Sequence, residues 1–182
     1  ASADWFLAAN PDWPCGDGTP ATSYCVDWRG QRPDTTLGLV YSYQNLTFLA
    51  SFAMALFAAP RSTICRIDGT PGLYFVYTLW IQFPEPVRRA EICLEGPLDV
   101  IRAYAGATLL AQVDAIEGVN VLEASGIQWL EIVSGSDNGT ILASLCYTTE
   151  ADAAAFDAET INQAIIEANA LSWSSADQIL PP

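Results

Sequence analysis

Residues 78–148 contain a series of short runs in which apolar and polar side chains alternate. Alternation with a period of two is typical of a β-strand that is buried on one face. Turn clusters separate the runs, so each run with its turn takes about 8–12 residues, the spacing of an all-β sandwich or barrel. This stretch therefore predicts an all-β, antiparallel sandwich. Its runs are TLWIQF, VRRAEICLE, DVIRAYA, TLLAQVD, NVLEAS, IQWLEIVS and TILASLCYT.

The alternation also predicts the direction of individual side chains, because successive residues of a strand point to opposite faces. The residues expected to face the core are Leu79, Ile81, Phe83, Ala90, Ile92, Leu94, Ile101, Ala103, Leu130, Ile132, Ile141, Ala143, Leu145 and Tyr147. The residues expected to face outward are Trp80, Gln82, Arg89, Glu91, Cys93, Glu95, Arg102, Tyr104, Trp129 and Glu131. The cluster SGSDNG at 134–139 predicts a hairpin connection, since Asn-Gly accepts positive φ.

Three segments follow from these patterns. Residues 1–21, rich in Pro and Gly, predict an irregular N-terminal arm, residues 22–148 the sandwich, and residues 149–182 a C-terminal tail. Earlier strands are expected at 24–30, 37–51, 62–68 and 73–77, with a hairpin turn at Gln44-Asn45 in the second of them.

The tail is rich in Ala and carries apolar residues at helical spacing, which predicts a helix over about 150–172. Asp157 is expected to cap its N-terminus, and the last residues, which end in Pro181-Pro182, are expected to be extended.

The segment 37–60 contains no charged residue. A transmembrane helix needs about 20 predominantly apolar residues, and Ser42, Gln44, Asn45 and other polar side chains interrupt this run, so no membrane span is expected. Two interpretations remain: a buried strand followed by an apolar loop, or an exposed apolar patch that meets a partner.

The chain has 21 acidic residues, 7 Arg, no Lys and no His, and a formal net charge of −14. A surface of this sign repels nucleic acid and acidic membranes. Without His or Lys, a Ser-His or Cys-His nucleophile, a Schiff base and a His-metal site are excluded, whereas paired carboxylates, as in glycoside hydrolysis, remain possible. The acids are scattered, so no catalytic residue is predicted and the protein is not expected to be an enzyme.

Five cysteines without a C-x-x-C pair favour disulfides over sulfur-bound zinc. We expect Cys15 to pair with Cys25 across a turn-rich loop, and Cys93 with Cys146 on neighbouring strands, which leaves Cys65 free. Two N-glycosylation sequons begin at Asn45 and Asn138. The chain begins at Ala1 without a signal peptide, so we expect a processed protein located outside the cell or on its surface.

Two kinds of ligand are hypothesised, a glycan on the outward aromatic residues and calcium on carboxylates in turns. Trp80, Tyr104 and Trp129 could form a platform on which a sugar ring stacks, with Gln82 and Glu131 fixing its orientation. Aromatic side chains covered by a loop or a subunit contact are the competing interpretation. No cofactor is predicted; calcium is a weaker hypothesis, on turn carboxylates without EF-hand spacing, namely Asp17, Asp27, Asp34, Asp68 and Asp137.

The order of CVDW, NLTF, GLYF, LWIQFPEPVRRAEICLEG, DVIRAYA, GIQWLEIVSG and ILASLCY resembles the jelly-roll modules of secreted bacterial proteins, the galactose-binding-like and carbohydrate-binding-module group. The resemblance covers about residues 24–148 and lies in the rhythm of strands. It implies a jelly-roll sandwich that binds glycans, holds calcium or serves as a structural spacer or adhesin. It contains no binding-loop motif from which ligand residues could be transferred.

The sequence leaves two functions open. The first is a non-catalytic extracellular structural or adhesive subunit that associates with copies of itself, into a surface assembly or filament, through apolar termini. The alternative is a carbohydrate-binding module. The residues expected to make assembly contacts are Trp5, Phe6, Phe156, Ile161, Ile165, Leu171, Trp173, Ile179 and Leu180.

Overall fold

A computed structural model describes residues 24–58, 65 and 70–179 of the chain. The chain divides into two compact units, residues 1–150 and 151–182. The described part of the first unit is built from ten strands, and every pairing between them is antiparallel. The strands are β1 (Tyr24–Asp27), β2 (Val40–Tyr43), β3 (Leu46–Ala50), β4 (Ala55–Phe57), β5 (Gly72–Phe75), β6 (Thr78–Glu95), β7 (Val100–Ala105), β8 (Thr108–Asp114), β9 (Gly118–Val133) and β10 (Thr140–Thr149).

Strand β6 is the longest and shapes the sheet. Its 18 residues would span about 59 Å if straight. Both of its ends nevertheless meet the same six-residue loop, 134–139. The Ser134 N–H donates to the carbonyl of Tyr77, which precedes β6, and Gly96, which follows β6, packs against Gly139. Six residues reach at most about 20 Å, so β6 must fold back on itself.

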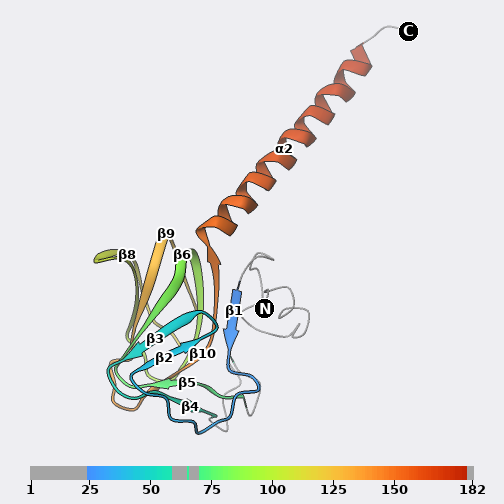
Figure 1. Ribbon diagram of the computed structural model, residues 1–182. Coiled ribbons are helices and arrows are strands. Elements are labelled where there is room, and N and C mark those ends of the chain that lie inside the picture. The colour runs from blue at the N-terminus through green and yellow to red at the C-terminus, as the bar shows by residue number, and fades with distance from the viewer. Residues whose placement is uncertain (1–23, 59–64, 66–69, 180–182) are drawn as a thin grey trace. The chain divides into compact units, whose positions relative to one another are not determined.

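The fold-back occurs at Pro84-Glu85-Pro86, where the pairing of β6 with β9 shifts register between Gln82 and Val87. Prolines cannot donate to a β-ladder, so a bend with interrupted pairing suits them. β9 bends with β6, and Figure 1 shows the two strands side by side. Two layers result, joined by these strands.

The first layer contains β2, β3, β7, β8, residues 78–83 of β6 and residues 127–133 of β9. The second layer contains β1, β4, β5, β10, residues 87–95 of β6 and residues 118–123 of β9. The pairs β7–β8, β6–β9 and β5–β10 are nested in the sequence, as in a jelly roll. The predicted antiparallel sandwich is confirmed.

One hydrophobic core lies between the layers and contains side chains from both halves of β6. Leu79 and Ile81 come from its first half, and Ala90, Ile92 and Leu94 from its second, all of them fully buried. The predicted inward direction of these five residues is confirmed. So is that of Phe83, Ile101, Ala103, Leu130, Ile132, Leu145 and Tyr147.

Strand β10 departs from the predicted alternation at its start. A register shift against β6 between Leu142 and Ser144 marks a bulge, which changes the face of the residues that follow. Leu142 therefore joins the main core, whereas Ala143, predicted to face it, is buried in a second cluster with four cysteines. The alternation could not reveal this shift because a bulge inserts one residue without a composition signal.

Two connections also differ from the prediction. Residues 84–86 were expected to separate two strands, but β6 continues through them. The loop 134–139 is not a hairpin, because β6 lies between β9 and β10 and the loop instead crosses from one layer to the other. The turn at Gln44-Asn45 is confirmed: both residues have positive φ, and β2 and β3 pair on either side of it.

The second unit is the helix α2 (Glu150–Ile179). It begins seven residues before Asp157, so the predicted N-cap is wrong; Asp157 lies inside the helix. It also runs past residue 172, where an extended end was expected, because Ser, Ala, Asp and Gln are tolerated in helices and Pro181 is the first strong breaker. Leu180 and the residues after it lie outside the described part of the chain.

Candidate functional site

Three aromatic side chains gather on the outer face of the first layer, and we call Trp80, Tyr104 and Trp129 the aromatic platform. Three adjacent strands carry them: Trp80 lies on β6, Trp129 on β9 and Tyr104 on β7. Tyr104 is the cross-strand partner of Trp129, and Gln82, two residues after Trp80, is the partner of Trp129 on its other side. Successive side chains of a strand point to opposite faces, so the residues on either side of each ring face the core and the rings themselves stay partly exposed.

The rings of Tyr104 and Trp129 are stacked, with centroids 4.1 Å apart and planes 8° from parallel. The indole N–H of Trp129 donates to the Gly106 carbonyl at 2.9 Å, which fixes the ring over the β7–β8 turn. Stacking and a satisfied N–H both reduce the rotamer freedom of these side chains. A rigid aromatic surface loses little entropy when a ligand lies on it.

The third ring is held by a chain of polar contacts. The indole N–H of Trp80 donates to Glu131 Oε2 at 3.2 Å, and the Arg102 guanidinium binds Glu131 Oε1 at 2.7 Å and Gln112 Oε1 at 2.9 Å. The hydrogen bond with Glu131 raises the pKa of Arg102 above its usual value. Glu131 therefore positions Trp80, whereas the sequence suggested that it would contact a ligand directly.

A shallow pocket of ≈ 280 Å³ opens beside the platform and is lined by Leu49, Trp80, Ile81, Gln82 and Trp129. Its walls are almost entirely apolar, and the exposed Gln82 amide stands at its rim. Apolar walls with a few polar groups are the usual composition of a small-molecule site. Such a surface suits the apolar face of a sugar ring, with the amide hydrogen-bonding to hydroxyl groups.

All five residues predicted to bind a glycan, Trp80, Gln82, Tyr104, Trp129 and Glu131, lie on this face. The sequence missed two contributors. Leu49 was assigned no direction, although its pairing with Trp80 places it in the pocket. Arg102 was predicted only to point outward, and nothing in its spacing identified Glu131 as its partner.

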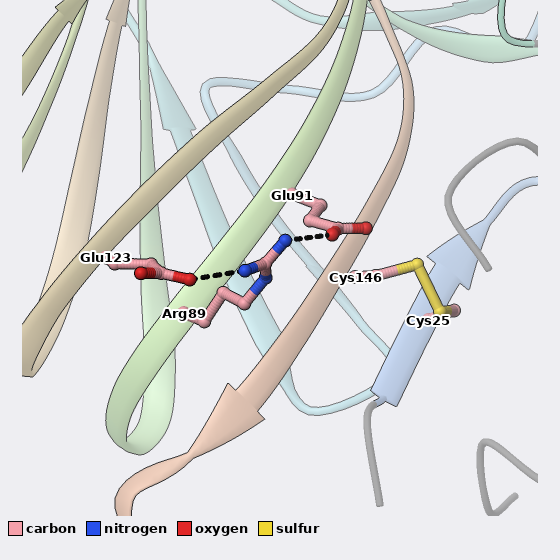
Figure 2. A network of polar contacts seen from close by, with 5 residues as sticks. All are labelled: Cys25, Arg89, Glu91, Glu123 and Cys146. Carbon is pink, nitrogen blue, oxygen red and sulfur yellow. Dashed lines mark hydrogen bonds and ion pairs between the residues drawn. A yellow bond between two sulfur atoms is a disulfide. The ribbon is translucent and has the colours of Figure 1, made fainter. Parts of the chain in front are cut away.

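The outer face of the second layer is different, because the side chains predicted to face outward do so but are covered. Glu91, Cys93 and Glu95 do point away from the main core, but they are at most 5% exposed. Figure 2 shows the Arg89 guanidinium between Glu91 and Glu123. These hydrogen bonds raise the pKa of Arg89, and they satisfy the buried Glu91 carboxylate.

The disulfides belong to this same face, and the predicted pairing is wrong. Cys25 bonds Cys146, and Cys65 bonds Cys93. Cys25 and Cys146 are direct partners in the β1–β10 ladder, a neighbourhood that only the strand order reveals. Cys93 is one strand further from β1, on β6. Cys15 lies outside the described residues, as do the residues of the N-terminal arm.

The turn carboxylates in the described part of the chain do not assemble into a cation site. Asp27 is buried and accepts the backbone N–H of Arg29 at 2.7 Å, and burial raises its pKa. Among the described residues, no group of three or more His, Cys, Asp or Glu side chains could hold a metal ion. Asp34 and Asp137 belong to that part of the chain, whereas Asp17 and Asp68 lie outside it.

The other predicted sites lie in loops and in the helix. Asn45 and Asn138 are both exposed, each in a connection between strands. Of the nine predicted assembly residues, the structure describes the side chains of two: Ile161 is 59% exposed and Ile165 is 53% exposed. Trp5, Phe6 and Leu180 lie outside the described residues. Phe156, Leu171, Trp173 and Ile179 are in the helix, without described side chains.

The uncharged segment 37–60 forms β2, β3 and β4, as far as it is described, and α2, the described helix, is not long and apolar enough to cross a membrane. No protein-family model matches the sequence, and no curated protein is significantly similar to it. The functional argument therefore rests on the geometry of the site.

Proposed function

We propose that this protein is a non-catalytic, extracellular carbohydrate-binding module that stacks sugar rings on the aromatic platform. The observation that supports it best is the joint placement of three rings from three adjacent strands on one exposed face, beside an apolar pocket. Each ring is held by a hydrogen bond or a stacked neighbour, so the surface is organised before a ligand arrives. The resemblance to carbohydrate-binding modules favours the same role.

The extracellular location is part of this proposal. Two disulfides favour an oxidising compartment, and the sequon asparagine Asn138 is exposed where an oligosaccharide could be attached. Detection of the glycosylated, oxidised protein in the medium or on the cell surface would support the location. A protein found reduced in the cytosol would contradict it.

Affinity electrophoresis tests the glycan hypothesis directly. Migration is measured in gels containing hydroxyethylcellulose, xylan, galactomannan, mixed-linkage β-glucan or soluble starch. We expect retardation in at least one gel, and we expect Trp129→Ala to weaken binding about tenfold, the loss of one stacking contact. Phe57→Ala is the matched control, because Phe57 is an exposed aromatic residue on β4 of the other layer. Unretarded migration in all gels, or equal effects of the two substitutions, would refute the function.

The helix supports self-association as a second candidate function. Ala154, Ala158, Ile161, Ile165 and Ala168 follow one another at alternating spacings of four and three, and all are exposed. This is the spacing of a coiled-coil seam, and we expect it to pair with the same seam of a second copy of the protein. The acids Asp152, Glu159 and Glu167 fall outside the seam positions, so they do not oppose the pairing directly.

Sedimentation velocity over a range of concentrations tests this second function. We expect the full chain to associate and the double substitution Ile161→Gln/Ile165→Gln to shift it toward monomer, because Gln keeps helix propensity while removing the apolar contact. Ile166→Gln is the matched control: Ile166 is 60% exposed but lies off the seam. A chain that remains monomeric at high concentration would eliminate the assembly hypothesis and leave the glycan site unaffected.

A further inference from the structure

A second pocket, of ≈ 440 Å³, lies where the tip of the β2–β3 hairpin and the bend of β6 meet β1 and β10. Its volume is in the range of sites that hold small molecules or parts of larger ligands. The described residues that line it are Tyr24, Cys25, Val26, Gln44, Asn45, Pro84, Glu85, Tyr147 and Thr149.

The walls of this pocket combine an aromatic surface with polar side chains. Tyr24 stacks on Tyr147 at 5.4 Å between centroids and remains 38% exposed, so one tyrosine forms the base and the other an accessible wall. Gln44, Asn45 and Glu85 line the same space, and the Gln44 amide donates a hydrogen bond to the Tyr43 hydroxyl at 3.3 Å. Aromatic rings next to amides and a carboxylate can recognise a polyhydroxylated ring by stacking and hydrogen bonding.

The two amides are presented by a strained turn. Gln44 and Asn45 have φ of 48° and 67°, a region that L-residues other than Gly seldom occupy, and Gln is tolerated there less well than Asn. Strain of this kind persists where the surrounding structure fixes it, often in a binding site. The turn places both residues in the lining of the pocket.

The register of β3 against β6 links this second pocket to the aromatic platform. Leu49 pairs with Trp80 at the platform, and Thr47 pairs with Gln82 one step further along. Two residues beyond, Asn45 and Pro84 both line the second pocket. The row from Trp80 to Pro84 spans four residues, or about 13 Å, which is longer than one pyranose ring.

We propose that these two pockets are the ends of one binding track, defined by Leu49, Thr47 and Asn45 on one strand and Trp80, Gln82 and Pro84 on the other. This inference rests on the proposed function and names its ligand class: a chain of several neutral sugar units. One end of the chain stacks on the platform, its middle passes Gln82, and its other end stacks on Tyr24.

The charge of the track favours a neutral glycan. No basic residue is among the described residues that line either pocket, and Glu85 stands in the second. At the platform, Arg102 is already engaged by Glu131. With a net charge of −14 the protein repels uronic acid and sulfated chains at a distance as well.

Titration calorimetry with cello-, manno-, xylo- and chito-oligosaccharides, from disaccharide to hexasaccharide, tests the track. The protein is produced in a bacterial host without N-glycosylation, because a glycan on Asn45 would cover this end. We expect the hexasaccharide of at least one series to bind about tenfold more tightly than its disaccharide, the gain from one further stacking contact. Tyr24→Ala should remove that gain and leave disaccharide binding unchanged, whereas Tyr24→Phe should preserve it.

Two further variants keep the outcomes distinct. Glu85→Ala, at the exposed bend, should weaken only the longer oligosaccharides and serves if Tyr24→Ala does not fold. Ile116→Ala, which removes a side chain that is 60% exposed and lines neither pocket, should change nothing. Equal affinity for disaccharide and hexasaccharide, with Trp129→Ala still reducing both, would overturn the track but retain the platform. Binding to none of the oligosaccharides would overturn both.

Discussion

The two halves of β6 both carry outward side chains, yet the surroundings of those side chains differ. In the first layer, Trp80 and Gln82 remain accessible beside a pocket. In the second, Glu91 and Cys93 are buried. Stability alone favours covering large aromatic side chains, so the accessible ones are the better candidates for binding a partner.

The polar contacts on the two faces have correspondingly different consequences. Arg89 bridges the buried Glu91 and the exposed Glu123, and this cluster ties β6 to β9 on the face that carries the disulfides. Arg102 and Glu131 sit at the rim of an open surface and orient Trp80. If the comparison is right, changes around Arg89 and the disulfides on the outer face of the second layer should mainly lower the free energy of unfolding, and changes to the outer face of the first should mainly lower glycan affinity.

The largest effect is expected from the disulfide that closes the longest loop. Replacing both Cys25 and Cys146 by Ala should lower the free energy of unfolding by about 2–5 kcal/mol, because the unfolded chain regains the entropy of a loop closed over 121 residues. Urea denaturation measures the change, and calorimetry below the transition should find disaccharide binding at the aromatic platform unaltered, because neither cysteine lines that pocket.

The second disulfide tests whether the loss of stability depends on the length of the loop that a disulfide closes. Cys65 and Cys93 are 28 residues apart, so the chain-entropy relation makes the loss from their joint replacement about 1 kcal/mol smaller. Peptide mapping without reduction should show these same two pairs. A bridge between Cys93 and Cys146 would contradict the fold of the second layer.

The next largest effect on stability is expected from one of two glutamate substitutions, one on each outer face, which together compare the two faces directly. Glu91→Ala removes a buried carboxylate that binds Arg89, which still keeps Glu123, so we expect a loss of about 1–3 kcal/mol in the free energy of unfolding. Glu131→Ala should cost less stability. It should lower glycan affinity about fivefold, since Trp80 loses the acceptor that orients its ring. Similar stability losses with no change in affinity would show that the two faces do not differ in function.

Much of the fold could be predicted from the sequence because period-two alternation reports burial on one side of a strand. Leu79 and Ile81, or Leu130 and Ile132, show it clearly. The alternation cannot say whether the opposite side is also covered, which depends on distant segments. Glu91 and Trp80 therefore received the same prediction and have different surroundings.

The site was predictable to the extent that it depends on direction along single strands. Trp80, Tyr104 and Trp129 were selected as outward aromatics, and strand order brings them together. Features that depend on pairing between strands could not be predicted, because register is set by the three-dimensional fold. The Trp80–Glu131–Arg102 contacts and the Cys25–Cys146 bridge are of this kind.

The smallest effect concerns Tyr147, which joins the layers: it stacks on Tyr24 of β1 and contacts Phe83 from the first half of β6 at 5.1 Å between centroids. Burial, and then the charges of Tyr24 and Glu85, raise the pKa of Tyr147 to about 12 from an ordinary value of 10.0. The unfolded chain thus loses this proton at lower pH than the folded chain. The stability linked to Tyr147 is fully present below pH 10 and is lost as pH rises through the folded pKa.

After a discount for solvent screening, this linkage is worth at most about 2 kcal/mol. Urea denaturation from about pH 9 to about pH 12 should show a free energy of unfolding that declines above about pH 10 in the wild type. Tyr147→Phe should flatten the decline in part, because burial also raises the pKa of Tyr41 and that contribution stays. A decline of equal slope in both proteins would mean that Tyr147 is not shielded from water, and that the contact between the layers at the second pocket is looser than the structure shows.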